Sequence, residues 1–305
     1  MLDGVAAIAP PVLVLFSGGR DSTCLLDLAV RAHGAGAVRA LHVNFGLREG
    51  ADGDEAHCRK VCAGLAVELE VVRAGEPPPR GNLQAWAREE RYAAAIRHAG
   101  GATILVGHTR SDQAETVLYR LASSPSRRAL LGMRSHDGRL ARPLLGVSRE
   151  ETAAWCVEHG LAWREDPSNA DASFSRTRVR AGLLPALRAV HPAAEENVAA
   201  AAALLRDEAE VLDGLVAAET RRERISVERL RELHPALARL VVQELADRAA
   251  GRLVPGAARR FPDVLALGGE GALDVGGGVR ARVERGVLSF GPSEGRAARQ
   301  EASTS

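Results

Sequence analysis

Residues 12–33 read VLVLFSGGRDSTCLLDLAVRAH. The five apolar residues 12–16 predict a buried strand, and residues 22–33 have the pattern of a helix that starts soon after the glycines. Glycines let backbone N–H groups approach an anion closely, and the N-terminus of the following helix favours negative charge. We interpret the stretch as a strand, a phosphate-binding loop and a helix. The alternative is an ordinary glycine turn after a strand.

The loop itself is Ser17-Gly18-Gly19-Arg20-Asp21-Ser22, and both of its serine hydroxyls can donate hydrogen bonds to a phosphate. It is not a Walker A loop, because the G-x-x-x-x-G-K-[ST] spacing is absent. The loop therefore predicts phosphate binding of another kind.

The alternation of strand and helix continues along the chain. Further strands are expected at residues 38–43, 67–72 and 103–106, and helices up to about residue 66, at residues 83–99 and from residue 112 onward. Such alternation predicts an α/β fold, Rossmann-like, in which helices cover both faces of a parallel sheet.

The character of the chain changes near residue 190. We expect a catalytic domain over residues 1–190 and a connecting helix, rich in Ala, Glu and Arg, over residues 191–224. A smaller, mainly helical domain should follow over residues 225–292 and end in a β-hairpin at residues 272–290, where apolar and polar residues alternate across glycines. Residues 293–305 are small and polar, which is typical of a disordered tail.

The composition limits the classes of function. The formal net charge is +1, which argues against indiscriminate binding of polyanions. Lys60 is the sole lysine among 40 basic residues, and arginine is suited to forked phosphate contacts, although the bias can also reflect genomic composition. No apolar run approaches the length of a membrane span and no leader segment is visible, so we expect a cytoplasmic protein without membrane contact.

The four cysteines, Cys24, Cys58, Cys62 and Cys156, form no C-x-x-C pair. They favour neither a disulfide framework nor an all-cysteine metal site. Cys58 and Cys62 lie one helical turn apart, which suits two small residues on one helix face better than a redox or ligand role.

Acidic and basic side chains further along the chain suggest chemistry. Asp112 and Glu115 stand at i and i+3 of a predicted helix, so both can face one point and bind Mg²⁺ or an ammonium ion; the alternative is a solvated helix start. His108 follows a strand, where open α/β sheets place functional groups, although a lone histidine there is often structural. The run Arg176, Arg178 and Arg180 suggests anion binding or an ordinary charged surface.

Several motifs occur in the order that a known family shows. The loop resembles the S-G-G-x-D-S signature of PP-loop enzymes, and H-V-N-F-G-L-R from His42, G-H-T-R-S-D-Q-A-E-T from Gly107 and R-P-L-L from Arg142 resemble motifs of tRNA(Ile)-lysidine synthetases. E-D-P-S-N from Glu165, with Phe174, Arg176 and Arg180, resembles a fourth, and the hairpin at 273–290 more weakly resembles the family's L-x-x-x-G-G-x-x-V pattern. The chain departs from the family at Phe45, Ser111 and Thr177, and at residues 123–132, where a glycine-rich loop is usual.

This resemblance implies ATP-dependent ligation of L-lysine to carbon 2 of the wobble cytidine of an isoleucine tRNA, through an adenylated intermediate, with release of pyrophosphate and AMP. ATP and Mg²⁺ are the implied cofactors, and a homodimer is compatible with the family. Implied catalytic residues are His108, Asp112, Glu115 and Arg180. The loop Ser17, Gly18, Gly19, Arg20, Asp21 and Ser22 would bind ATP together with His42. Arg142, Arg176 and Arg178 would bind tRNA, and Asp21 and Asp112 would bind metal.

Three other functions fit parts of the sequence. Another PP-loop tRNA-modifying enzyme, such as a tRNA thiolase, would adenylate a base but usually carries cysteine pairs. A non-catalytic nucleotide sensor would not need His108, Asp112 and Glu115. A metabolite ligase would normally need a glutaminase unit, for which the sequence shows no signal.

Overall fold

Strand β1 (Val12–Leu15) lies at the centre of the first sheet and is buried on both faces. Successive strand residues point to opposite faces. Accordingly, Val12 and Val14 belong to one hydrophobic cluster, and Leu13 and Leu15 belong to another. The continuous apolar run in the sequence therefore reflects a strand covered by helices on both sides.

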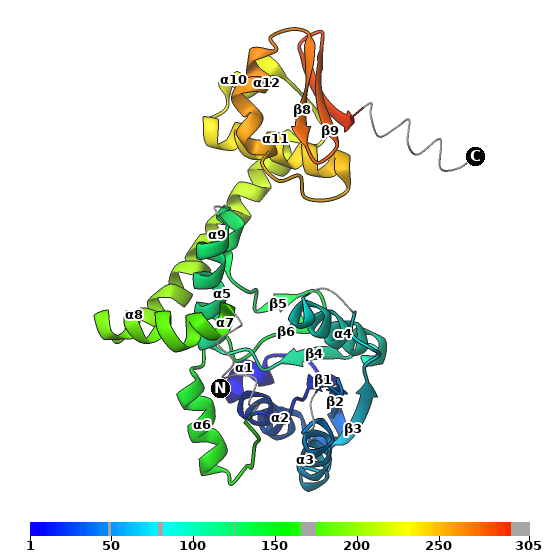
Figure 1. Cartoon of the computed structure of the whole chain (residues 1–305), viewed down its shortest axis with the longest axis vertical. Coiled ribbons are helices and arrows are strands. Elements are labelled where there is room, and N and C mark those ends of the chain that lie inside the picture. Colours follow the sequence, from blue (N-terminus) through cyan, green and yellow to red (C-terminus); the bar gives the residue numbers. More distant parts are fainter. Residues whose placement is uncertain (48–49, 79–81, 125, 166–174, 294–305) are drawn as a thin grey trace, which may run out of the picture. The chain divides into compact units, whose positions relative to one another are not determined.

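The computed structural model describes residues 1–47, 50–78, 82–124, 126–165 and 175–293, and the chain divides into two units, Met1–Leu205 and Arg206–Ser305. The sheet of the first unit has the order β3-β2-β1-β4-β6-β5 (Figure 1). Its other strands are β2 (Val38–Asn44), β3 (Glu68–Arg73), β4 (Thr103–Val106), β5 (His136–Asp137) and β6 (Leu140–Ala141). All pair in parallel except β5, which runs antiparallel to β6.

Helices pack on both faces of this sheet, as predicted (Figure 1). The cluster around Val12 and Val14 includes residues of α1 (Leu2–Ala6), α2 (Arg20–His33), α3 (Ala51–Gly64) and α6 (Arg149–Glu158). The cluster on the opposite face includes residues of α4 (Leu83–His98). The short 3-10 turn Ala35–Ala37 connects α2 to β2.

A further helical group surrounds α5 (Arg110–Ser123), which packs through Ala114 and Leu118 against Val179 and Leu184. These partners come from a π-helical turn at Val179–Leu183 and from α8 (Leu184–Val190), which follow α7 (Ser175–Arg178). Between α5 and β5 lies a 3-10 helix, Arg127–Leu131.

The division between the two units falls inside α9 (Ala194–Glu219). The second unit contains α10 (Val227–Glu232), α11 (Pro235–Ala250), a 3-10 turn (Ala257–Arg260) and α12 (Phe261–Ala266). Its antiparallel sheet has the order β7-β10-β9-β8, with β7 (Arg224–Ser226), β8 (Gly271–Gly276), β9 (Val279–Glu284) and β10 (Val287–Pro292). The predicted hairpin is therefore part of a larger, four-stranded sheet. Sequence pattern missed β7 because a strand of three residues shows little alternation.

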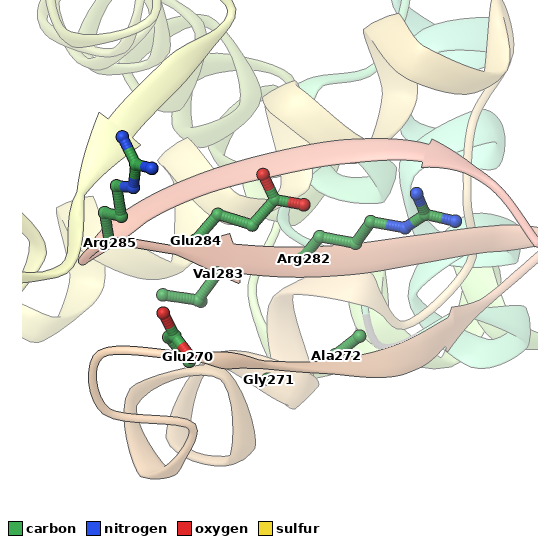
Figure 2. Close-up of a pocket in the computed structure, with 7 residues that line it drawn as sticks. All are labelled: Glu270, Gly271, Ala272, Arg282, Val283, Glu284 and Arg285. Atoms are coloured by element: carbon green, nitrogen blue, oxygen red, sulfur yellow. The ribbon is translucent and has the colours of Figure 1, made fainter.

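A hollow of about 460 Å³ lies at strands β8 and β9 of the second unit. Figure 2 shows that acidic and basic side chains line it together: Glu270, Glu284, Arg282 and Arg285. It contains none of the predicted site residues. We therefore place the candidate active site in the first unit, where those residues gather.

Some predicted features lie outside the described residues. These are Arg48 of the motif after β2, residues 166–169 and Phe174 of the motif that starts at Glu165, and the tail from residue 294. None of the helices among the described residues combines the length and the hydropathy that a membrane span needs.

Candidate active site

The phosphate loop lies between the end of β1 and the start of α2. The hydroxyl oxygens of Ser17 and Ser22 are 3.0 Å apart, and the Ser22 hydroxyl donates to the Gly19 carbonyl oxygen at 2.9 Å. No side chain caps α2 at Gly19, so the backbone N–H groups of its first turn are available to an anion. The six predicted residues thus form one continuous loop at an uncapped helix start, a geometry that suits an anion.

Glycine is required at two positions in or beside this loop. Gly18 has φ +77°, and a Cβ there would lie 2.9 Å from the Sγ atom of Cys58. Gly107 follows β4, and a Cβ there would lie 3.1 Å from the carbonyl group of Asp21. The ends of β1 and β4 therefore meet at the loop. This is the point at which the strand order reverses, where open α/β sheets bind ligands.

His42 supports the loop from β2. Its Nδ1 atom lies 2.9 Å from the Phe16 carbonyl oxygen, which can only accept, so Nδ1 carries the proton. Burial lowers the pKa of His42, which keeps the ring neutral. Two residues on, Asn44 donates to Glu55 at 3.0 Å and accepts from the Gly46 backbone at 2.9 Å. The H-V-N-F-G motif thus fixes the turn beside the loop.

The segment before Glu165 also contacts the loop. The backbone N–H of Arg164 donates to the Gly18 carbonyl oxygen at 3.0 Å, and its guanidinium forms an ion pair with Asp54 at 2.8 Å. The motif that starts at Glu165 therefore follows directly after a phosphate-loop contact.

Asp112 and Glu115 do face one point, as their spacing predicts, and that point is the guanidinium group of Arg149. Its Nη2 atom lies 2.6 Å from Oδ1 of Asp112, and its Nη1 atom lies 2.8 Å from Oε1 of Glu115. Arg180 adds bonds of 2.7 and 3.0 Å to the two oxygens of Glu115. Glu115 is 2% exposed. Two arginines thus neutralise the two carboxylates.

The Asp112 side chain also caps the N-terminus of α5. Its Oδ2 atom accepts from the backbone N–H of Thr109 at 2.8 Å and from the Thr109 hydroxyl at 2.9 Å, within a capping box. Burial alone would raise the pKa of Asp112, but Arg149, His108 and these hydrogen bonds outweigh it and hold the pKa below its ordinary value. Asp112 is therefore ionised at neutral pH.

Arg149 is a site residue that the sequence analysis missed. It is the first residue of α6, after the N-cap Ser148, and its side chain is 18% exposed. Its Nε atom lies 3.9 Å from Oδ2 of Asp21, and Thr152, one turn later, donates to Oδ1 of Asp21 at 2.5 Å. The capping signal was visible in the sequence, but the partners of Arg149 were not.

His108 and Arg142 have buried polar atoms without partners among the described residues. These atoms are Nδ1 of His108 and Nε of Arg142, a residue that is 4% exposed and donates through Nη1 to the Arg134 carbonyl oxygen at 2.8 Å. Burial lowers the pKa of His108 to about 4, against the opposing field of Asp112. His108 is therefore neutral at physiological pH.

The arginine run is divided between two environments. Arg176 donates to the hydroxyl of Thr116 at 2.8 Å, and Arg180 contacts Glu115, so both face α5. Arg178 is exposed and donates to the Ser175 hydroxyl at 2.9 Å. The alternation in sequence thus places two of the three arginines against α5 and leaves the third on the surface.

The unusual segment 123–132 is anchored by a residue that the sequence did not single out. Gln113 donates to the Met133 carbonyl oxygen at 3.0 Å and accepts from the Met133 N–H at 2.7 Å, and Arg120 donates to the Gly132 carbonyl oxygen at 2.9 Å. The end of this segment is therefore fixed to α5.

A hollow of about 320 Å³ lies beside the acidic pair. Its basic lining consists of Arg20, Arg149, Arg180 and Arg188. Ser111, which replaces the first acid of the family motif, also lines it and donates to Glu195 at 2.6 Å. A carboxylate from α9 thus stands beside the position where the family has an acid.

The residues fit a nucleotide better than a protein-bound metal cluster. Among the described residues, no group of three or more His, Cys, Asp or Glu side chains could hold a metal ion. Mg²⁺, however, typically binds through one or two carboxylates and the phosphates of a substrate. Asp21 lies beside the uncapped helix start and Asp112 lies at the start of α5, so both could supply such a carboxylate, although Oδ1 of Asp21 already accepts from Thr152 and Arg20 and both oxygens of Asp112 accept hydrogen bonds.

Comparison with known proteins agrees with this geometry. The PP-loop domain family matches residues 7–187. The chain is 44% identical over 211 residues to the tRNA(Ile)-lysidine synthase of Pseudomonas syringae pv. tomato, which covers 66% of this chain and 47% of that protein. It is 38% identical over 295 residues to the tRNA(Ile)-lysidine synthase of Nocardia farcinica, covering 92% of each. The matches to Pseudomonas relatives thus span about half of those proteins.

Among solved structures, the U34-tRNA thiolase NcsA from Methanococcus maripaludis, with its [4Fe-4S] cluster, superposes with a TM-score of 0.57 at 16% identity. The match covers 67% of this chain and 78% of that chain. At this identity the likeness shows the fold alone.

Proposed function

Because the chain belongs to the PP-loop domain family and, within it, to the family of the tRNA(Ile)-lysidine synthases, we propose that it uses ATP to join L-lysine to carbon 2 of the wobble cytidine of an isoleucine tRNA. One structural observation carries the proposal. The phosphate loop and the acidic pair of α5 lie in one site, joined through Arg149, so a nucleotide and a second substrate can meet there.

The loop residues Ser17, Gly18, Gly19 and Ser22 hold the phosphates of ATP through backbone N–H groups and hydroxyls. His42 keeps the loop in place through the Phe16 carbonyl. Asp21 is the metal-side carboxylate of our proposal, and Mg²⁺, when bound, supplies positive charge to the departing pyrophosphate. The cytosine O2 atom attacks the α-phosphate, and the O2–phosphorus bond forms as the bond to pyrophosphate breaks.

In the second step, the ε-amine of lysine attacks carbon 2. The new C–N bond forms as the C–O bond breaks, and AMP leaves with the electron pair of that bond. The amine must be unprotonated to attack, and we propose that it meets the neutral imidazole of His108, whose buried Nδ1 atom has no partner among the described residues and can accept a hydrogen bond from it. Asp112 and Glu115 are held in place by Arg149 and Arg180, and these four side chains together orient the amine.

Arg142 and Arg176 are proposed contacts for tRNA phosphates. Arg142 is a buried charge with no acidic partner within the described part of the chain, and such charges are costly unless a ligand completes them. Arg178, which is exposed, would contact the tRNA outside the site. The second unit would add shape and phosphate contacts to the same tRNA.

The cysteines disfavour a thiolase. All four are unpaired and buried, and burial raises the pKa of the Cys58 and Cys62 thiols to about 12. A sulfur carrier needs an accessible thiolate. The thiolase alternative therefore lacks an accessible thiol in this chain.

The deciding experiment follows radiolabelled lysine into a transcript of isoleucine tRNA that carries a wobble cytidine. Label should appear as lysidine only when ATP is present, and a matched transcript with a wobble uridine should stay unlabelled. The variant Asp112→Ala should stop incorporation while the protein keeps its fold. Release of pyrophosphate without label would keep the ATP chemistry and refute lysine as the nucleophile.

A further inference from the structure

Three carboxylates from two different helices meet one cation in the first unit. Asp21 lies in the first turn of α2, whereas Asp112 and Glu115 lie on α5. The guanidinium of Arg149 contacts the α5 carboxylates at 2.6 and 2.8 Å, and its Nε atom is 3.9 Å from Asp21. Arg149 is thus a charged link between the phosphate loop and the acidic pair.

The first turn of α6 holds this link rigidly. Ser148 accepts from the N–H of Glu151 at 3.1 Å and donates its own N–H to the Glu151 carboxylate at 2.7 Å, so the helix start is fixed by a capping box. Thr152 lies on the same side of α6, since it is three residues after Arg149. Its hydroxyl donates to Asp21 at 2.5 Å. One helix turn therefore contacts the ATP loop and α5 together.

The two carboxylates of α5 and the two arginines that contact them balance in charge. Asp112 and Glu115 carry two negative charges, and Arg149 and Arg180 carry two positive charges. Loss of Arg149 would leave Asp112 without its short ion pair, and Glu115 would keep only Arg180. The two α5 carboxylates would then repel each other and shift, since an uncompensated buried charge is unfavourable.

From this geometry we infer that Arg149 is a positioning residue that couples the nucleotide loop to the lysine-transfer step, by tying Asp21 on α2 to Asp112 and Glu115 on α5. The inference rests on the proposed function for the identity of the second step. Arg149 keeps Asp112 and Glu115 in a fixed position relative to the phosphate loop. The amine can then attack the adenylated base before water hydrolyses it.

The test measures pyrophosphate released per lysine incorporated, in wild type and in Arg149→Met, which keeps an unbranched apolar stem and removes the guanidinium group with its charge. In Arg149→Met, the kcat of lysine incorporation should fall about 10- to 100-fold, because small misplacements of a reacting group cost this much. The KM for lysine should not rise. Pyrophosphate release should persist, so the ratio should rise several-fold. Arg149→Lys should give an intermediate ratio, because the lysine ammonium keeps the charge but lacks the planar set of N–H donors with which arginine binds two carboxylates at once.

The matched control is Arg110→Met. Arg110 also stands at a helix start, at the first residue of α5, and contacts Glu151 at 3.7 Å and the Gly146 carbonyl oxygen at 3.4 Å, but none of the three site carboxylates. Its ratio should equal that of wild type. A purely structural role of Arg149 would lower both half-reactions in parallel and leave the ratio unchanged. That result would overturn the inference.

A second measurement needs neither tRNA nor lysine. The dissociation constant of ATP is measured for wild type, Asp112→Asn, Arg149→Met and the double variant, after thermal unfolding confirms that each is folded. Coupling through Arg149 predicts that Asp112→Asn changes ATP affinity by about threefold or more in wild type and much less in Arg149→Met. Additive effects would overturn the inference. If wild type incorporates no lysine, the proposed function fails, and this cycle still decides the role of Arg149.

Discussion

Replacement of Gly18 by alanine should weaken ATP binding as well as lower stability. Gly18 has φ +77°, and its new Cβ would lie 2.9 Å from the Sγ atom of Cys58 and 3.2 Å from Cδ2 of His57. The first contact is about half an ångström short of an ordinary one. Cys58 lies on α3 and is fully buried, so it cannot move away from the new Cβ. The phosphate loop must therefore move instead.

The size of the effect follows from two terms. A positive φ costs a residue with a Cβ about 1–2 kcal/mol, which for a unit of this size lowers Tm by roughly 2–8 °C. Displacement of one backbone N–H from a charged phosphate costs about 1.5–3 kcal/mol, or roughly 10- to 150-fold in Kd. Gly18→Ala should show both effects.

Gly138→Ala is the matched control, because Gly138 has φ +59° in the β5–β6 turn and a Cβ there would meet no atom within 4 Å. It should lose stability without losing ATP affinity. ATP binding is measured by calorimetry and stability by thermal unfolding. The reasoning is refuted if Gly18→Ala binds ATP within about threefold of wild type, or if Gly138→Ala loses equal affinity.

Three further predictions concern stability and tRNA. Hydrogen bonds from Asn44 and Arg59 lower the pKa of Glu55 from 4.5 to about 2, so its stabilising effect is present above pH 4.5 and is lost as pH falls towards 2. Glu55→Gln should therefore lower the free energy of unfolding at neutral pH by about 1–2 kcal/mol. It should also weaken the pH dependence of stability between pH 4.5 and 2; an unchanged pH dependence in calorimetry contradicts this. Glu115→Gln should destabilise by about 3 kcal/mol in urea unfolding, and a change below the error of the method argues against a buried ion pair. Deletion of residues 225–305 should weaken tRNA binding and flatten its salt dependence, while ATP binding survives; loss of ATP binding would indicate one inseparable fold.

Much of the fold was predictable because its signals are local. The strand, loop and helix around Ser17 are encoded in consecutive residues, and the helix expected at residues 83–99 is α4, Leu83–His98. Strands β5 and β6 have two residues each, too few for any periodicity to register. The four-stranded sheet of the second unit exceeded the expected hairpin because residues 271–292 form three strands rather than two, and because β7 lies far from β10 in sequence.

The candidate site was predictable only in part, because its residues contact partners distant in sequence. The spacing of Asp112 and Glu115 correctly predicted that they face one point. It could not reveal that Arg149, 37 and 34 residues later, occupies that point. Ser111 likewise looked like the loss of an acid, whereas Glu195, 84 residues away, brings a carboxylate to it. Such compensation depends on tertiary packing, which one sequence does not display.

The arginines beside the acidic pair bear on how an amine could react there. An ammonium ion arriving at Asp112 and Glu115 meets carboxylates that Arg149 and Arg180 already balance, so it gains little net attraction. Cationic neighbours and loss of water both lower the pKa of an amine. Neutral His108, which follows β4, can accept a hydrogen bond from the neutral amine. The sequence predicted that Asp112 and Glu115 bind a cation. With both carboxylates balanced by arginines, the site is better suited to a neutral amine, and the neutral amine is the form of lysine that attacks carbon 2.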